Sequence, residues 1–287
     1  MNFSLKNHRK QIKTLPMKKL LFSLGAIVLL VLFTNFTFTS LLKEDATKTS
    51  LQTRQFYQLK TYTLANEEQV QMTDSYLREA FLPALKKLNI GPVGVFKPIP
   101  VATDTLHKIL VLVPFASLTQ MQVLEDALQQ DETYLNAGKA YIHAAHDQPA
   151  YQRMGSVILQ AFKNMPVLKA PMFETPRNQR VYELRSYESP SENYYKNKVE
   201  MFNEGGEVQL FDRLQFNAVF YGEVISGPKM PNLMYLTTFS DQESRDAHWK
   251  AFGDSPEWKT MSSLPKYQNN VSHADITFLY PTDYSEY

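Results

Sequence analysis

The chain has 287 residues, of which 44% are hydrophobic and 13% aromatic, which is enough for two domains with packed cores. Six basic residues lie within the first 19 residues, where no acidic residue occurs, and subtracting them from the formal net charge of +1 leaves −5 for the remainder. A slightly acidic body argues against a nucleic-acid-binding groove, which depends on clustered Lys and Arg. The absence of cysteine excludes disulfides, thiolate zinc sites and cysteine nucleophiles.

The first 40 residues are typical of an export signal. Lys18 and Lys19 precede the apolar run "LLFSLGAIVLLVLF", and its 14 residues fall short of the roughly 20 that a membrane-spanning helix needs. We expect residues 17–40 to be a signal peptide, with an uncleaved anchor as the alternative because no A-x-A-like cleavage site is visible. Residues 1–16 are interpreted as an extension from an upstream start codon. The expected location is the periplasm or cell envelope of a bacterium, with the N-terminal segment as the sole membrane contact.

After a polar linker, residues 41–54, the heptapeptide "FYQLKTY" begins a predicted first unit over 55–170. A helical pattern follows and stops at Gly91-Pro92, and the strands "VGVF" and "KILVLVPF" come next. Ser117-x-x-Gln120 predicts a capping box ahead of a helix over 118–130. A helical insertion and the strand "SVILQAF" complete the unit.

The same order is repeated over 178–284. The heptapeptide returns as "VYELRSY", a helical pattern broken at Gly205-Gly206 follows, and then come the strands "NAVFYG" and "NLMYLTTF". Ser240-x-x-Glu243 predicts the cap of a helix over 241–252, and "ADITFLYP" is the last strand.

The order β-α-β-β-α-β, written twice, predicts an α+β protein of tandem ferredoxin-like units. Each antiparallel sheet has helices on one face and needs a cover for the other. We therefore expect the two sheets to pack face to face within one chain, an intramolecular pseudo-dimer of the dimeric α/β-barrel type. Further homo-oligomers stay open.

Residues 245–258 carry a recognisable signature within the second unit. The spacing of Arg245, Ala247, Trp249, Phe252 and the "PEW" that follows, together with "YELRSY", resembles the bacterial NIPSNAP family. The first unit has Met121, Glu125 and Tyr134 at the positions of Arg245, Trp249 and Trp258, so it matches by architecture alone. The resemblance implies a dimeric α/β-barrel fold shared with antibiotic-biosynthesis monooxygenases, but it implies no reaction and supplies no catalytic residues.

The candidate ligand-binding residues are five side chains of the second unit: Glu183, Arg185, His248, Trp249 and Trp258. If Tyr182 and Leu184 face the helices, strand alternation points Glu183 and Arg185 into the space between the sheets, where they would orient a small ligand. The alternative, which we favour, is a structural ion pair. For His248 and Trp258 we likewise favour packing roles over ligand contact.

His143 and His146, beside Asp147, lie three residues apart in the insertion, but no further ligand accompanies them, so we expect no metal. No phosphate-binding loop or hydrolase motif is present, and no cofactor is expected.

Two functions fit the sequence. The favoured hypothesis is a non-enzymatic module of the envelope that binds a small molecule or a protein. The alternative is a cofactor-independent monooxygenase or isomerase acting on a small metabolite in the barrel interior. A cavity lined by Glu183 and Arg185 would favour the enzyme, and an interior filled by side chains would favour the binding module.

Overall fold

The computed structural model describes residues 53–101, 105–171 and 173–287. The expected extension (1–16), the signal or anchor (17–40) and all but the last two residues of the linker (41–54) lie outside the described residues. Within the described part of the chain, no helix is both long enough and apolar enough to cross a membrane.

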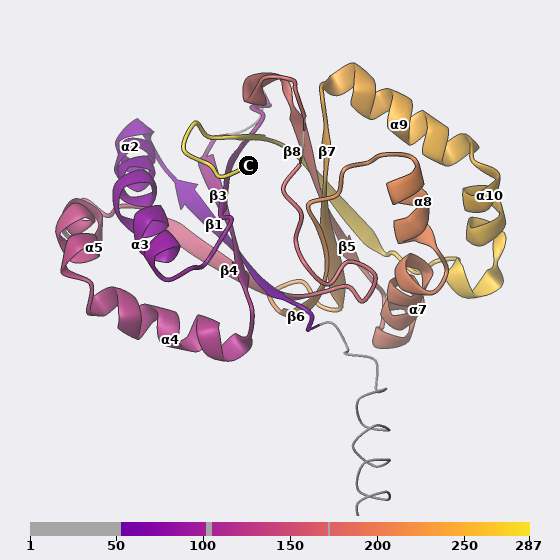
Figure 1. The fold of residues 1–287 in the computed structure, drawn as a ribbon, viewed down its shortest axis with the longest axis horizontal. Coiled ribbons are helices and arrows are strands. Elements are labelled where there is room, and N and C mark those ends of the chain that lie inside the picture. The colour runs from indigo at the N-terminus through magenta and orange to yellow at the C-terminus, as the bar shows by residue number, and fades with distance from the viewer. Residues whose placement is uncertain (1–52, 102–104, 172) are drawn as a thin grey trace, which may run out of the picture. The chain divides into compact units, whose positions relative to one another are not determined.

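The first half follows the predicted order, with extra short helices in the insertion (Figure 1). Its strands are β1 (Phe56–Leu64), β2 (Gly94–Pro98), β3 (His107–Phe115) and β4 (Arg153–Ala161). Its helices are α2 (Glu67–Tyr76), which continues through a π-turn (Leu77–Phe81) into α3 (Leu82–Lys87), then α4 (Leu118–Gln129), α5 (Glu132–Ala137) and α6 (Lys139–Ile142).

The second half repeats this order. A 3-10 turn (Arg177–Gln179) leads into its first strand, and a second (Pro265–Tyr267) precedes its last. Its strands are β5 (Val181–Glu188), β6 (Phe220–Ser226), β7 (Asn232–Phe239) and β8 (His273–Pro281). Its helices are α7 (Glu192–Asn203), α8 (Glu207–Arg213), α9 (Gln242–Asp254) and α10 (Pro256–Ser263).

The eight strands close into one antiparallel barrel in the order β1-β3-β2-β8-β5-β7-β6-β4, and β4 pairs with β1. The two halves are joined where β2 meets β8, with Phe96 opposite Pro281, and where β4 meets β6, with Ala161 opposite Gly222. The predicted fold class, tandem ferredoxin-like units whose sheets face each other, is therefore confirmed. The joined edges go further than that prediction and leave no unpaired strand edge in the barrel.

The repeated heptapeptides are the first strands of the two halves, and their second residues occupy equivalent places. The ring of Tyr57 lies 5.3 Å from that of Phe220, and the ring of Tyr182 lies 5.1 Å from that of Phe96. Each half thus places the tyrosine of its first strand against a phenylalanine of the other half.

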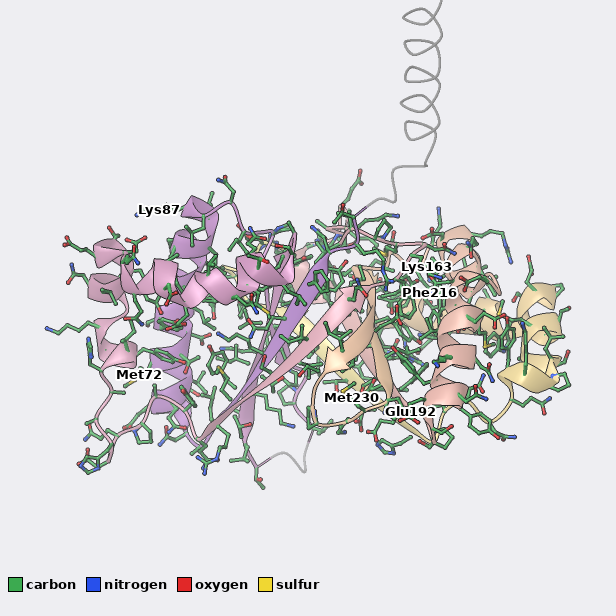
Figure 2. The ribbon with its side chains drawn as sticks, turned by 90° about the horizontal axis from the view of Figure 1, so that it is seen from below. Met72, Lys87, Lys163, Glu192, Phe216 and Met230 are labelled. Atoms are coloured by element: carbon green, nitrogen blue, oxygen red, sulfur yellow. The ribbon has the colours of Figure 1, made fainter. Side chains whose placement is uncertain are left out.

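Three large apolar cores follow from this arrangement, beside a small cluster of Met201, Met261 and Tyr267. One lies under the helices of the first half and another under the helices of the second, and Figure 2 shows these helical layers on opposite sides of the strands. The third contains residues from all eight strands and none from any helix, so it is the barrel interior. β5 and β7 are therefore largely buried on both faces, which makes burial alone a poor guide to which way their side chains point, whereas the first four residues of β4 are exposed.

The helix starts show where local sequence decides structure. Ser117 caps α4 as predicted, because its Oγ accepts the Gln120 amide at 3.1 Å while the Gln120 side chain accepts the Ala116 amide at 2.8 Å. The predicted capping residue Ser240 is wrong: Asp241 caps α9 and its Oδ1 accepts the amide of Ser244 at 2.7 Å. Carboxylate and hydroxyl groups are similarly good caps, so two adjacent candidates cannot be ranked from the sequence.

Candidate functional site

Glu183 and Arg185 lie on the outer face of β5, under α9, and not in the barrel interior. Tyr182 and Leu184 belong to the interior core instead. The premise that the Tyr and Leu face meets the helices is therefore wrong, and with it the less favoured alternative of a ligand cavity lined by Glu183 and Arg185 between the sheets; the two side chains instead form an ion pair on the outer face. The physical reason is that both faces of β5 are buried, so the alternation of the heptapeptide separates two faces without saying which is which.

Glu183 is the centre of a buried polar cluster, and its carboxylate is fully inaccessible to solvent. Arg185 donates Nε to Oε1 at 2.7 Å. Arg245, from α9, donates Nη2 to Oε1 at 2.9 Å and Nε to Oε2 at 2.8 Å. Trp249, one turn further along α9, donates Nε1 to Oε2 at 2.8 Å. Two guanidinium groups and an indole therefore satisfy both carboxylate oxygens, as a buried charge requires.

The cluster keeps Glu183 ionised. Burial on its own would raise the pKa of this carboxyl, but the hydrogen bonds from Arg245, the charge of Arg185 and the hydrogen bond from Trp249 outweigh burial and hold the pKa below its usual value. The Arg185 guanidinium also lies 3.7 Å from the centre of the Trp249 ring, a cation–π contact. A carboxylate with four donors has little capacity left to accept a proton from a substrate.

The network continues along the strand through two tyrosines. Arg185 donates Nη1 to the hydroxyl of Tyr187 at 2.8 Å, and that hydroxyl lies 2.9 Å from the hydroxyl of Tyr235 on β7. Neither tyrosine was singled out from the sequence, although Tyr187 is the last residue of the repeated heptapeptide. Strand alternation places Tyr187 on the same face as Arg185, two residues earlier, and this spacing is the sequence signal that could have identified Tyr187.

A second buried ion pair lies between α7 and α8. Lys198 Nζ is 2.9 Å from Glu207 Oε2, and the two side chains are 7% and 4% exposed. The ammonium also lies 4.7 Å from the ring centre of Phe202 and 5.8 Å from that of Trp258. Burial raises the pKa of Glu207, which the charge of Lys198 partly opposes. This pair could not be identified from the sequence, because a lysine in an amphipathic helical pattern is normally assigned to the exposed face.

His248 and Trp258 serve as packing residues. His248 Nδ1 is 2.5 Å from the carbonyl oxygen of Ser244 in its own helix, and its ring lies 5.4 Å from that of Phe239. The ring of Trp258 lies 4.5 Å from that of Phe252. Four of the five predicted residues thus belong to the two polar clusters or directly line them, and His248 packs on the neighbouring aromatic core.

The first half has no equivalent network at the matching positions. Gln58 stands where Glu183 stands and donates to Ser156 Oγ at 2.9 Å. Lys60 stands where Arg185 stands; burial lowers its pKa, opposed by the charge of Glu125. The polar cluster is therefore a property of the second half alone.

The barrel interior is occupied by buried side chains and not by polar groups that converge on an open cavity. Tyr57 and Tyr182 are fully buried there, and their hydroxyls have no hydrogen-bond partner among the described residues. Unpaired buried hydroxyls are uncommon and costly. Thr238, which lies opposite Tyr182 on β7, has another buried hydroxyl without a partner among the described residues.

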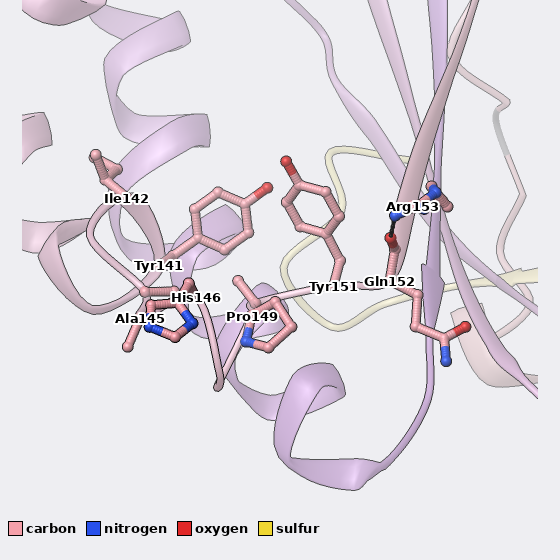
Figure 3. A pocket seen from close by; sticks show the side chains of 10 residues that line it. Tyr141, Ile142, Ala145, His146, Pro149, Tyr151, Gln152 and Arg153 are labelled. Carbon is pink, nitrogen blue, oxygen red and sulfur yellow. Dashed lines mark hydrogen bonds between the residues drawn. The ribbon is translucent and has the colours of Figure 1, made fainter.

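An open hollow of about 840 Å³ lies in the insertion of the first half (Figure 3). Tyr141 and Tyr151 line it, with ring centres 5.8 Å apart, and His146 and Arg153 lie at its margin. The set holds no nucleophile paired with a base, so it offers a contact surface and not a reaction centre.

A further cluster of potential metal ligands lies where β5 and β8 pair. Donor atoms of Glu188, His273 and Asp275 lie within 4.8 Å of one another. Lys229 forms ion pairs with both carboxylates, to Asp275 and, at 3.4 Å, to Glu188. The Lys229 ammonium thus offsets one of the two carboxylate charges. The sequence did not reveal this cluster because the ligands and Lys229 come from three separate segments.

Comparisons with known proteins agree with this geometry. The NIPSNAP family model matches residues 182–286. No curated protein sequence matches the chain. Among solved structures, a proposed monooxygenase from Fusobacterium nucleatum is similar, with 8% identity over 80% of this chain and 93% of that one, and a TM-score of 0.53.

Two NIPSNAP family proteins from Agrobacterium tumefaciens match about half as much of the chain. One shares 14% identity over 42% of this chain and 97% of its own, with a TM-score of 0.34. The other shares 19% identity over 40% of this chain and 98% of its own, with a TM-score of 0.32. The family match and the Arg245 to Trp258 signature fall on the same half of the barrel. Residues 182–286 of this chain are a NIPSNAP domain.

Proposed function

We propose that this protein is a non-enzymatic binding module of the bacterial envelope, which holds a small molecule or a protein partner. The observation that carries the proposal is the filled barrel interior: apolar side chains from all eight strands form one continuous core there. An enzyme that works inside the barrel needs a cavity with converging polar groups, and this interior offers packing instead.

The state of the buried charges supports the same proposal. Glu183 is engaged by three donor side chains, and Glu207 by Lys198. A general acid or base must be free to exchange a proton with a substrate, and these carboxylates are committed to neighbouring side chains. The likeness to a proposed monooxygenase at 8% identity concerns the fold, and one fold supports many functions.

The placement in the envelope rests on the N-terminal sequence, with its basic residues and short apolar run. Since the second half supplies the cover that the first half needs, a single chain forms the complete barrel. We expect a monomeric chain to be competent for binding, with larger assemblies as an outcome of the test.

Native mass spectrometry of the protein isolated from the envelope fraction of its host tests the proposal. The expected result is a folded chain that retains a partner mass, lost on denaturation, with the subunit count read from the same spectrum. Recovery in the cytosol would contradict the envelope placement. Conversion of the retained molecule into a product during incubation would contradict the non-enzymatic role.

A further inference from the structure

Glu188, His273 and Asp275 share one face of the barrel wall. Glu188 lies opposite His273 in the pairing of β5 with β8, and Asp275 follows His273 by two residues. Tyr182 and Leu184, which precede Glu188 at steps of two along β5, belong to the interior core, so strand alternation places Glu188 on the interior face. Because Glu188 ends β5 and His273 begins β8, the three side chains lie at one mouth of the barrel.

The three side chains are spaced as the ligands of one metal ion. Donor atoms, one from each side chain, lie within 4.8 Å of one another, and His273 Nε2 lies 3.0 Å from Asp275 Oδ1. Bonds of about 2.0–2.2 Å to a tetrahedral zinc ion separate the ligand atoms by about 3.3 Å, so small side-chain rotations bring these donors onto one ion. An imidazole nitrogen beside two carboxylates favours zinc over Mg²⁺ and Ca²⁺, which take oxygen ligands.

The ammonium of Lys229 already lies where a cation would be bound. Lys229, in the loop between β6 and β7, forms ion pairs with Asp275 and, at 3.4 Å, with Glu188. Its side chain is 50% exposed, and ion pairs at exposed positions are weak because water hydrates both partners. A divalent ion balances the charge of both carboxylates, whereas the lysine offsets one of them, so such an ion can displace the ammonium.

A buried oxygen beside the cluster supports a polar ligand at this mouth. Asn232 lies opposite Glu188 on β7 and is 2% exposed. Its Nδ2 donates to Ser186 Oγ at 2.8 Å, and Ser186 lies opposite Asp275 on β8. The Asn232 side chain therefore reaches over the interior face of β5 toward the cluster, yet its Oδ1 has no hydrogen-bond partner among the described residues. A buried acceptor of this kind requires a donor, and a water molecule bound to a metal ion is one.

The first half shows that the fold does not require these ligands. Counted from the repeated heptapeptides, Thr63 corresponds to Glu188, and it lies opposite Arg153 in the pairing of β1 with β4. Neither Arg153 nor Gly155, two residues further on, offers a side chain that binds metals. The ligand set is therefore a property of the second half and not a consequence of strand pairing at this end of the barrel.

We propose that Glu188, His273 and Asp275 form a Zn²⁺ site at the barrel mouth. The ion displaces the Lys229 ammonium, water completes the coordination, and Asn232 offers its unpaired oxygen to that water. The site goes beyond the proposed binding of a small molecule or protein, because it lies at the end of the barrel and does not depend on how the interior is filled.

The test is a calorimetric titration of the untagged full chain with Zn²⁺, after a chelator has removed any bound metal. The expected result is one Zn²⁺ per chain in the wild type. His273→Ala and Asp275→Asn each weaken binding at least tenfold, whereas His107→Ala leaves it unchanged. His107 is the matched control, because it is an exposed histidine that begins β3 as His273 begins β8.

A second set of variants separates a metal site from an ion-pair cluster. Lys229→Met removes the competing ammonium and is expected to tighten Zn²⁺ binding at least fivefold, whereas Lys250→Met, which breaks an exposed ion pair with Asp254, has no effect. Co²⁺ in place of Zn²⁺ is expected to give the visible spectrum of a four-coordinate ion in the wild type, and this spectrum is lost in His273→Ala. The altered side chains are at least 42% exposed, so the variants are expected to fold.

Three outcomes would overturn the proposal. The first is a wild-type chain that binds no Zn²⁺. The second is binding that survives both His273→Ala and Asp275→Asn, because the ion would then lie elsewhere. The third is unchanged affinity in Lys229→Met, because the ammonium would then not compete with the ion. None of these outcomes bears on the proposed envelope binding module, which is tested by its retained partner.

Discussion

Replacement of Glu183 by glutamine removes the buried negative charge that holds two guanidinium groups and an indole together, and leaves Arg245 with only its partly exposed partner Asp246, at 2.9 Å. Arg185 and Arg245 are 12% and 18% exposed in their side chains, so neither can recover full hydration after the change. Glutamine also places an NH2 donor at one of the two positions where a carboxylate oxygen now accepts hydrogen bonds. Removal of one partner from a buried ion pair costs about 3–5 kcal/mol. Since Glu183 is fully buried, we expect a loss of that size in the free energy of unfolding.

Urea denaturation followed by tryptophan fluorescence measures this loss, because Trp249, one of the two tryptophans, donates to Glu183 itself. For a domain of this size each kcal/mol lowers the melting temperature by roughly 2–4 °C, so thermal unfolding should shift by about 6–20 °C. The matched control is Glu257→Gln, which breaks an ion pair to Arg213 in which both side chains are half exposed, and it is expected to change nothing measurable.

A Glu183→Gln variant as stable as the wild type would refute the argument that this cluster is a tightly coupled buried network. Charge reversal offers a second check, in which Glu183→Arg and Arg185→Glu are compared singly and together. A double variant that recovers much of the loss indicates that the two residues are coupled chiefly to each other, whereas no recovery indicates that Arg245 and Trp249 dominate.

Three further predictions concern stability. Lys198→Met should lower the free energy of unfolding by about 3–5 kcal/mol because it leaves Glu207 buried without its partner, and the double variant Lys198→Met, Glu207→Met should recover most of that loss in urea denaturation. Because the folded pKa of Glu183 lies below its usual value of 4.5, its contribution is complete above that pH and is lost as the pH falls through the folded pKa; acid titration of stability should therefore be flatter in Glu183→Gln than in the wild type. Leu184→Ala, in the barrel interior, should cost about 2–5 kcal/mol, whereas Leu264→Ala, at an exposed position, should cost little; equal losses would contradict the assignment of Leu184 to the interior core.

The element order and several boundaries could be predicted from the sequence, because apolar runs bounded by turn residues are local signals. The strand expected from "NLMYLTTF" is β7, Asn232–Phe239, and the strand expected from "ADITFLYP" is β8, His273–Pro281, which begins one residue earlier. The pairing of two copies followed from a physical need, since each half presents a sheet face that helices do not cover.

The orientation of β5 could not be predicted in the same way. Both faces of β5 are largely buried, so the rule that apolar side chains point inward does not decide its orientation. The partners that decide the matter for Glu183 are Arg245 and Trp249, which come from 62 and 66 residues further along the chain. The contact of Tyr287 with β2, far away in sequence, leaves no local signal either.

The two strand pairings that join the halves, β2 with β8 and β4 with β6, make each half depend on the other. A fragment that holds only residues 178–284 would expose the hydrogen-bonding edges of β6 and β8. A second copy of the same fragment could cover both edges, because two copies together supply eight strands. The half without the family signature therefore cannot be discarded as a spacer. The first half supplies β2 and β4 as the pairing partners of β8 and β6, so these two strands must keep their pairing geometry even where its helix-facing residues differ.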